Sequence, residues 1–240
     1  MKILMTSHRF APDVGGIEMI SEILARNFII LGHQVALVTQ SPHASDGSLD
    51  KLPFIVERTP SIPRLLALYR WADVVLQVNI ELRSLWPILF VRKPFVISTC
   101  TWVADTTGRT RIVDRLKRWV IGRATASIAN SQSVRRETCH GSVVIAHPYR
   151  SDAFRCLPNV DQKFALAFVG RMVSDKGVDL LLRAFAILLC DSSLLNHAQS
   201  SGWDLVLTLI GDGPEVPSLT RLAHDLAIDN HVRFVGSLQG

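Results

Sequence analysis

The chain has 240 residues, a formal net charge of +5 and 48% hydrophobic residues. This length can bury a large core, and it allows one large α/β domain or one domain with part of another. A pI of 9.3 fits anionic partners such as nucleotides, phosphates or membrane surfaces, and it also fits a merely basic protein. The four cysteines show no C-x-x-C spacing, and no apolar run reaches the ~18 residues of a membrane span, so we expect a cytoplasmic protein with free thiols.

The first elements predict a βαβ unit. Residues 2–6 are an apolar run without alternation, as expected for a parallel strand buried on both faces. A loop rich in breakers follows, then a helix that begins near Ile17, and residues 34–39 return as the second strand. The pair Gly15 and Gly16 would let a phosphate or sugar approach the backbone closely, although such a turn can also need glycine purely for its geometry.

The same alternation continues through the first half. It predicts a parallel sheet with helices on both faces, in which ligands lie beyond the carboxyl ends of the strands. Strand-like runs occur at residues 54–57, 74–78, 95–98, 126–129 and 143–146, and helical segments occur at 63–70, 81–91 and 133–139. The ligand-facing positions are therefore residues 8–16, 79–81, 99–105 and 130–133.

Between Arg109 and Arg123 the sequence predicts a strongly basic helix with an apolar stripe. A basic amphipathic helix that contains tryptophan can lie on an anionic membrane surface, so peripheral contact with the inner face of a membrane is one interpretation. The interpretation that we favour is that the stripe packs on the sheet. No nucleic-acid-binding motif is evident, so no nucleic acid is expected as a partner. The stripe consists of Ile112, Leu116, Trp119 and Val120.

A second βα series follows a linker. Residues 148–162 lack periodicity and carry two prolines, so we place a domain junction there, between domains at 1–147 and 163–240. The second domain is expected to contain strands at 164–169, 203–210 and 231–235 and helices at 178–190 and 215–228.

The start of this second series resembles an anion trap. Its first strand stops at Gly170 and is followed by Arg171, a short loop, Lys176 and a helix start. This order places two cations beside the free N–H groups of a helix N-terminus. The alternative is a surface turn with two solvated cations.

A glycine-rich turn closes the second strand of this series. Gly211, Asp212 and Gly213 resemble half of a dinucleotide fingerprint, but Val216 stands where its third glycine would be. We therefore do not expect NAD binding, nor a Rossmann-type dehydrogenase or epimerase.

Three motifs together resemble the retaining family 4 (group 1) glycosyltransferases. They are FAP and GGIE within residues 10–18, GRMVSDKGVDLL at residues 170–181, and LIGDGPE at residues 209–215. The resemblance implies a GT-B fold, in which two Rossmann-like domains face each other across a cleft. It also implies a metal-independent, hexosyltransferase-type transfer from a UDP- or GDP-sugar to a glycan or lipid-linked acceptor in cell-envelope polysaccharide synthesis.

The resemblance also assigns roles to residues. It gives Arg171 and Lys176 the donor diphosphate, where fixed cations and helix N–H groups stabilise the charge of the leaving group without a metal or other cofactor. Gly15 and Gly16 correspond to the glycine loop that reaches the donor from the first domain. The further donor-side residues are Gly211, Asp212 and Gly213, and the acceptor-side residues are Glu18, Thr101 and Asp105.

Two departures from the family pattern affect these expectations. Members often carry a histidine at the position of Thr101, and a hydroxyl cannot replace its proton chemistry, which leaves Asp105 as a candidate catalytic group. The family's glutamate pair follows the third strand of the second domain, whereas this sequence ends at Gly240.

We therefore expect a partial second domain and a truncated, weakly active or inactive transferase. A fragment, a degenerate reading frame and a short natural form all fit this expectation. The alternative function is a non-catalytic glycosyltransferase-like subunit that a partner chain completes.

Overall fold

The computed structural model describes residues 1–42, 52–103, 111–138, 141–156, 166–202 and 205–238. The chain divides into two compact units, Met1–Arg155 and Cys156–Gly240. Each unit has its own parallel sheet, so the prediction of an α/β fold with parallel sheets is confirmed. The two units are described separately.

The first unit contains a seven-stranded sheet with the strand order β3-β2-β1-β4-β5-β6-β7, and every neighbouring pair is parallel. Its strands are β1 (Lys2–Ser7), β2 (Gln34–Thr39), β3 (Ile55–Arg58), β4 (Val74–Val78), β5 (Phe95–Thr99), β6 (Ala126–Ala129) and β7 (Val143–Val144). Its helices are α1 (Gly16–Ile30), α2 (Ile62–Trp71), the 3-10 helix η1 (Trp86–Leu89), α3 (Ile112–Ile121) and α4 (Gln132–Thr138).

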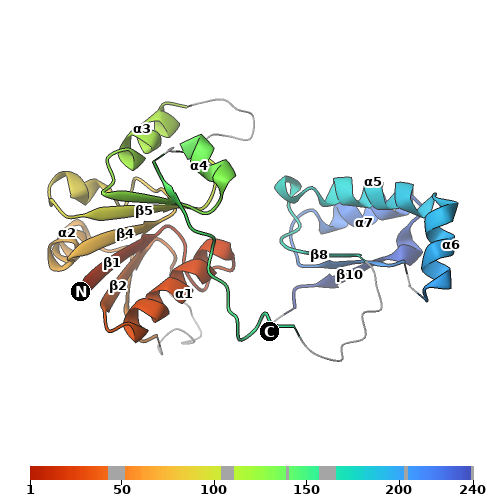
Figure 1. Ribbon diagram of the computed structural model, residues 1–240, viewed down its shortest axis with the longest axis horizontal. Helices are drawn as coiled ribbons and strands as arrows, with labels where there is room; N and C mark the ends of the chain where they lie inside the picture. Colours follow the sequence, from red (N-terminus) through yellow and green to blue (C-terminus); the bar gives the residue numbers. More distant parts are fainter. Residues whose placement is uncertain (43–51, 104–110, 139–140, 157–165, 203–204, 239–240) are drawn as a thin grey trace. The chain divides into compact units, whose positions relative to one another are not determined.

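Apolar side chains on both faces of the central strands explain this arrangement. In β1, Ile3 and Met5 face the core beneath α1, whereas Leu4 between them faces the core that contains α2. Five consecutive residues of β1 and of β2 are buried, which is the pattern of a parallel strand covered on both sides. Figure 1 shows the sheet between these helices, with β1 and β4 at its centre.

The predicted helix at residues 81–91, which Pro87 is expected to bend or shorten, is reduced to a single short element. Only η1 forms there, after a turn in which Asn79 adopts a left-handed φ of 61°. Side chains hold this turn locally, since Gln77 Nε2 donates to the Glu81 carbonyl (2.8 Å) and Ser84 Oγ donates to Glu81 Oε2 (3.0 Å). Pro87 stands at the start of η1 and has no N–H to donate to the carbonyl four residues before it. A regular α-helix therefore cannot run from residue 81 through Pro87 without losing that hydrogen bond.

The preferred interpretation of the basic helix is wrong in part. Ile112 of α3 is 85% exposed, and Leu116 and Trp119 are exposed on the same helix face. The helix packs inward through the buried Asp114 and Ile121 and the half-buried Val120. Three of the four stripe residues, Ile112, Leu116 and Trp119, are therefore exposed and do not pack on the sheet.

The second unit contains a three-stranded parallel sheet with the order β10-β9-β8. Its elements are β8 (Leu166–Val169), the 3-10 helix η2 (Ser174–Lys176), α5 (Val178–Leu189), α6 (Ser192–Ser200), β9 (Leu207–Ile210), α7 (Val216–Asp225), the 3-10 helix η3 (Asp229–His231) and β10 (Val232–Gly236). The sequence pattern did not predict α6.

Helices α5 and α7 cover one face of this small sheet, as Figure 1 shows. Their buried residues Leu182, Phe185 and Leu219 pack with Leu207 and Leu209 of β9 in a single core. Alternation along the strands turns the intervening side chains to the other face, where Val169 of β8 is 75% exposed. The second unit thus has one covered face and one open face among the described residues.

Candidate functional site

The loop between β1 and α1 lies at the carboxyl edge of the large sheet. Phe10 is fully buried and its N–H donates to Ser41 Oγ (3.0 Å), which fixes the middle of the loop. The guanidinium of Arg58 donates to the Ala11 carbonyl (2.7 Å) and to the Pro42 carbonyl (2.8 Å). Burial lowers the pKa of Arg58, and the nearby Asp13 partly offsets that effect. The backbone that leads to Gly15 is therefore held by the sheet.

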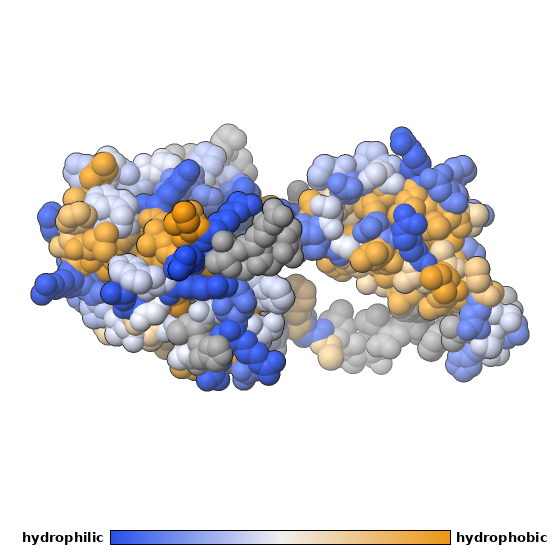
Figure 2. All heavy atoms as spheres, turned by 90° about the horizontal axis from the view of Figure 1, so that it is seen from above, coloured by the Kyte–Doolittle hydropathy of each residue, from blue (hydrophilic) through white to orange (hydrophobic). Residues whose placement is uncertain are grey.

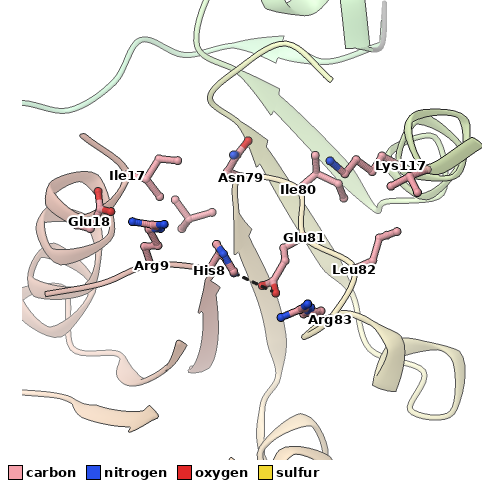
Figure 3. Close-up of a pocket in the computed structure, with 12 residues that line it drawn as sticks. His8, Arg9, Ile17, Glu18, Asn79, Ile80, Glu81, Leu82, Arg83 and Lys117 are labelled. Atoms are coloured by element: carbon pink, nitrogen blue, oxygen red, sulfur yellow. Dashed lines mark ion pairs between the residues drawn. The ribbon is translucent and has the colours of Figure 1, made fainter. Parts of the chain in front are cut away.

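A cavity of about 410 Å³ opens at this edge, in the first unit alone. Figure 3 shows the residues around it, which come from the end of β1, the start of α1, the turn after β4 and the helix α3. Its polar residues are His8, Arg9, Glu18, Asn79, Glu81, Arg83 and Lys117, and its apolar residues are Ile17, Val78, Ile80, Leu82 and Val113.

Glu81 is a largely buried charged group of this cavity. Its side chain is 13% exposed, and its Oε1 lies 3.4 Å from His8 Nδ1, the ion pair drawn in Figure 3. Oε1 has no hydrogen bond among the described residues, whereas Oε2 accepts from Ser84. A buried carboxylate oxygen without a hydrogen bond gains one when a ligand hydroxyl reaches it.

Gly15, Gly16 and Glu18 lie together where α1 begins. A Cβ atom on Gly15 would lie 2.5 Å from Glu18 Oε2, so the absence of a side chain at Gly15 lets this carboxylate lie against the backbone. Gly16 has open space around the position of a Cβ atom. Gly15 and Glu18 also line a second cavity of about 690 Å³, which continues along α1 to Tyr149 and Arg150.

The other acceptor-side candidates are not brought into these two cavities. Thr101 is exposed beyond the end of β5 and lines neither of them. Asp105 lies outside the described residues. The adjacent Cys100 is buried, and burial raises the pKa of its thiol, which favours the protonated form over a reactive thiolate.

In the second unit, Arg171 and Lys176 lie on the loop from β8 to α5. Met172 between them is fully buried in the core, which anchors the loop beside the carboxyl end of β8. Both cations are exposed. Lys176 Nζ lies 3.8 Å from Asp175 Oδ2, and Arg171 has no ion pair within the described part of the chain.

The start of α5 adds N–H donors to this loop. Gly177 precedes the helix with a left-handed φ of 66° and has no side chain that could cap it. The N–H groups of the first turn therefore receive no hydrogen bond from a capping side chain. Asp179 in that turn offsets part of the positive helix end. A cavity of about 410 Å³ lies beside the first turns of α5 and α7, but neither Arg171 nor Lys176 lines it.

The glycine turn after β9 packs directly against the Arg171 loop. A Cβ atom on Gly211 would lie 1.9 Å from the Gly170 carbonyl oxygen, and one on Gly213 would lie 2.3 Å from the Met172 carbonyl oxygen. Asp212 accepts from the Gly213 N–H (2.7 Å) within its own turn. These contacts give all three residues a structural role that positions the loop carrying Arg171.

Sequence reasoning found most of the polar side chains around the first cavity and missed two of them, Arg83 and Lys117. The expected ligand-facing ranges included His8, Asn79 and Glu81, because these residues follow strands. Arg83 and Lys117 carried no comparable signal, because their approach depends on the turn after β4 and on the position of α3. Within the described ranges no cluster of histidine, cysteine or acidic residues could hold a metal ion. No helix in these ranges is long and apolar enough to cross a membrane.

Comparison with known proteins gives a family match over part of the chain and matches to solved structures. Residues 150–239 match the family model Glycosyl transferases group 1. A search of curated proteins by sequence found no significant match. Among solved structures, Anabaena HepE in complex with UDP and glucose is 18% identical to this chain, with a TM-score of 0.73. The match covers 100% of this chain and 70% of the HepE chain.

Two further solved structures are similar. The lipopolysaccharide outer core galactosyltransferase WaaB, in its apo form, is 15% identical with a TM-score of 0.64, and the match covers 100% of this chain and 69% of WaaB. WaaG, a glycosyltransferase involved in lipopolysaccharide biosynthesis, is 17% identical with a TM-score of 0.61. The match covers 99% of this chain and 70% of WaaG. At these identities the likeness shows the fold alone, and the predicted GT-B type of α/β fold is confirmed.

Proposed function

We propose that this chain takes part in the transfer of a hexosyl group, with retention and without a metal, from a nucleotide-diphosphate sugar to a glycan or lipid-linked acceptor. The observation that carries the proposal is the loop of residues 170–177, which lies within the stretch that matches the glycosyltransferase model. It carries Arg171, Lys176 and the uncapped start of α5 in the segment that follows the carboxyl end of β8.

The chemistry of the reaction requires such a loop. When the bond between the sugar and the nucleotide diphosphate breaks, negative charge builds on the leaving diphosphate. Fixed cations and N–H groups that are already in place stabilise this charge without rearranging during the reaction. The buried Met172 holds the loop in position, which favours this preorganisation over a freely solvated turn.

Similar structures support the choice of donor. HepE has been solved with UDP-glucose as well as with UDP and glucose. A UDP-sugar is therefore our first candidate and a GDP-sugar the second. Glu18, Thr101 and Asp105 stay proposed for the acceptor side, and Gly15 and Gly16 for contact with the donor.

Nucleotide titration tests this proposal directly. We expect UDP to bind the 240-residue chain in isothermal titration calorimetry. We expect the double variant R171A/K176A to bind UDP at least ~10-fold more weakly, because it lacks two charge-assisted contacts to phosphate. The control is Arg221→Ala, which removes an exposed arginine of α7. If neither UDP nor GDP binds, or if the double variant binds as wild type does, the proposal fails.

The proposed alternative is a non-catalytic subunit with the same scaffold. It would bind the nucleotide without turnover and would copurify with a complementary chain. Size-exclusion chromatography with light scattering on protein from the native host separates the two, since a stable complex of two different chains is expected only for the alternative.

We also propose that α3 contacts an anionic membrane surface from the cytoplasmic side. Ile112, Leu116 and Trp119 are exposed along one helix face, and Arg115 of the same helix is exposed as well. Figure 2 shows apolar and strongly hydrophilic residues close together on the side of the first unit that bears α3. The surface continues toward η1, where a groove lined by Leu89, Arg92, Lys93, Trp119 and Arg123 adjoins the helix. Apolar insertion together with cations is what interfacial binding requires.

Vesicle sedimentation tests this contact. The double variant I112S/L116S should bind vesicles of phosphatidylcholine and phosphatidylglycerol at least ~10-fold more weakly than wild type, since each buried aliphatic side chain contributes about 1.5–3 kcal/mol. Ile187→Ser, at an exposed position of α5 in the second unit, is the matched control. Equal sedimentation of wild type and the double variant would rule out α3 as the contact.

A further inference from the structure

Three cations from three different elements line the 410 Å³ cavity of the first unit. Arg9 follows β1, Arg83 lies between β4 and η1, and Lys117 is on α3. None of them has an ion pair among the residues that the structure describes, whereas four other arginines of this unit, Arg26, Arg64, Arg118 and Arg150, do. In Figure 3 Lys117 reaches from α3 toward Ile80, and Arg9 lies near Ile17 and Glu18.

Two carboxylates, those of Glu18 and Glu81, also line this cavity, and unlike the three cations each contacts a neighbouring group of the protein. Glu81 is held between His8 and Ser84, and Glu18 lies against the backbone at Gly15. Three cations and two carboxylates give the lining a net charge of +1 when His8 is neutral. The lining thus offers hydrogen-bond acceptors and unpaired positive charges to one ligand.

Asn79 contributes a further polar group between these charges. Its left-handed backbone follows directly on β4, and its Oδ1 accepts from the Cys100 N–H (3.4 Å). This bond fixes the amide and leaves its nitrogen without a hydrogen bond within the described ranges, so a donor is free on the cavity wall. The apolar residues Ile80, Leu82 and Val113 complete the lining.

We infer that this cavity binds a phosphorylated sugar, a sugar phosphate or sugar diphosphate ester, as the acceptor of the proposed transfer. Sugar hydroxyls would donate to Glu18 and Glu81, whose Oε1 has no other hydrogen bond. The phosphate would lie among Arg9, Arg83 and Lys117, since unpaired cations around a shared hollow are stabilised by an anion. A neutral glycan would leave these three charges without a partner.

The inference rests on the proposed function for the ligand's role, but not for its binding. The phosphate could belong to a soluble sugar ester or to a lipid headgroup. Lys117 and Val113 line the cavity from α3, whose next face carries the exposed Ile112, Leu116 and Trp119. A lipid-linked sugar phosphate on a membrane surface would therefore reach the cavity along this helix.

The binding experiment separates this site from the nucleotide site. The 240-residue chain with the substitutions R171A/K176A is titrated with α-D-glucose 1-phosphate and with glucose by calorimetry, so the proposed diphosphate cations are absent. We expect glucose 1-phosphate to bind and glucose to bind at least ~10-fold more weakly, because charge-assisted contacts are lost with the phosphate. Binding of UDP to the wild-type chain is a separate measurement, so either proposal can fail alone.

Two sets of variants locate the site within this background. Arg83→Ala and Lys117→Ala should each weaken glucose 1-phosphate binding about 10-fold or more, whereas Arg136→Ala on the exposed side of α4 should leave it unchanged. Glu81→Gln should weaken binding of glucose 1-phosphate but not of inorganic pyrophosphate, since the carboxylate contacts hydroxyls only. Thermal unfolding of each variant shows that it is folded.

Vesicles distinguish the source of the phosphate. Phosphatidylcholine vesicles with and without polyprenyl phosphate are sedimented with wild type and with Lys117→Ala. If polyprenyl phosphate increases the fraction of wild type that sediments, and Lys117→Ala loses this increase, the phosphate belongs to a lipid. If glucose 1-phosphate binds but polyprenyl phosphate has no effect on sedimentation, the phosphate belongs to a soluble ester. If neither phosphate probe binds, or if Arg83→Ala and Lys117→Ala bind both probes as their parents do, the inference is overturned.

Discussion

In a catalytically active form of the protein, Arg171→Ala should slow turnover of the nucleotide-sugar donor by ~100-fold or more, because removing one preorganised donor to a developing anion costs this much in other enzymes. Arg171 is exposed and has no ion pair in the described part of the chain, so its guanidinium is free to bind a diphosphate. The loss should appear mainly in kcat, because charge on the leaving group is larger in the transition state than in the bound donor. Release of UDP from the UDP-sugar, followed in a coupled assay, measures this effect.

The controls for this prediction separate charge from geometry. Arg171→Lys keeps the charge but loses the planar pair of donors, so it should fall between wild type and Arg171→Ala. Arg221→Ala removes the same charge from α7 and should leave turnover unchanged. Near-normal kinetics of Arg171→Ala would mean that the cation does not stabilise the leaving diphosphate.

The sequence predicts the central strands well, because a strand that is buried on both faces of a sheet has a continuous apolar run. Residues 2–6 and 34–39 are apolar runs, and the structure buries both strands between helices. Residues 81–91 are equally apolar, but bonds from Gln77 and Ser84 to Glu81 stabilise a turn instead. Local side-chain bonds of this kind compete with helix formation and leave no periodic signal.

The residues of the candidate site also fall into two groups, those that the sequence pattern singles out and those whose place depends on the fold. Arg171 and Lys176 could be singled out because they stand at fixed positions between a strand and a helix. The stripe of α3 could not be placed, since an amphipathic helix has the same sequence pattern whether it faces a sheet or a membrane. Lys117 lines the first cavity only because of where α3 lies, and a single sequence contains no information about that position.

Gly211→Ala should destabilise the second unit by about 3 kcal/mol or more, because it combines backbone strain with steric overlap. Gly211 has a φ of 138°, a region that residues with a side chain rarely adopt. Its Cβ atom would also lie 1.9 Å from the Gly170 carbonyl oxygen, and the Gly170 N–H donates to the Ile210 carbonyl (3.0 Å), so the two loops cannot separate without losing this bond. Urea unfolding followed by far-UV circular dichroism measures the loss.

Gly202→Ala is the matched control for this prediction. Gly202 also has a left-handed φ, 68°, but nothing lies within 4 Å of its Cβ position, so the substitution costs only the backbone strain, about 1 kcal/mol. The difference between the two variants measures the overlap with the Gly170 loop. Because Gly170 precedes Arg171, Gly211→Ala should also weaken UDP binding under conditions in which the chain stays folded. Equal stability of the two variants would show that the loops after β8 and β9 can move apart, and the preorganisation assigned to Arg171 would then lose its structural basis.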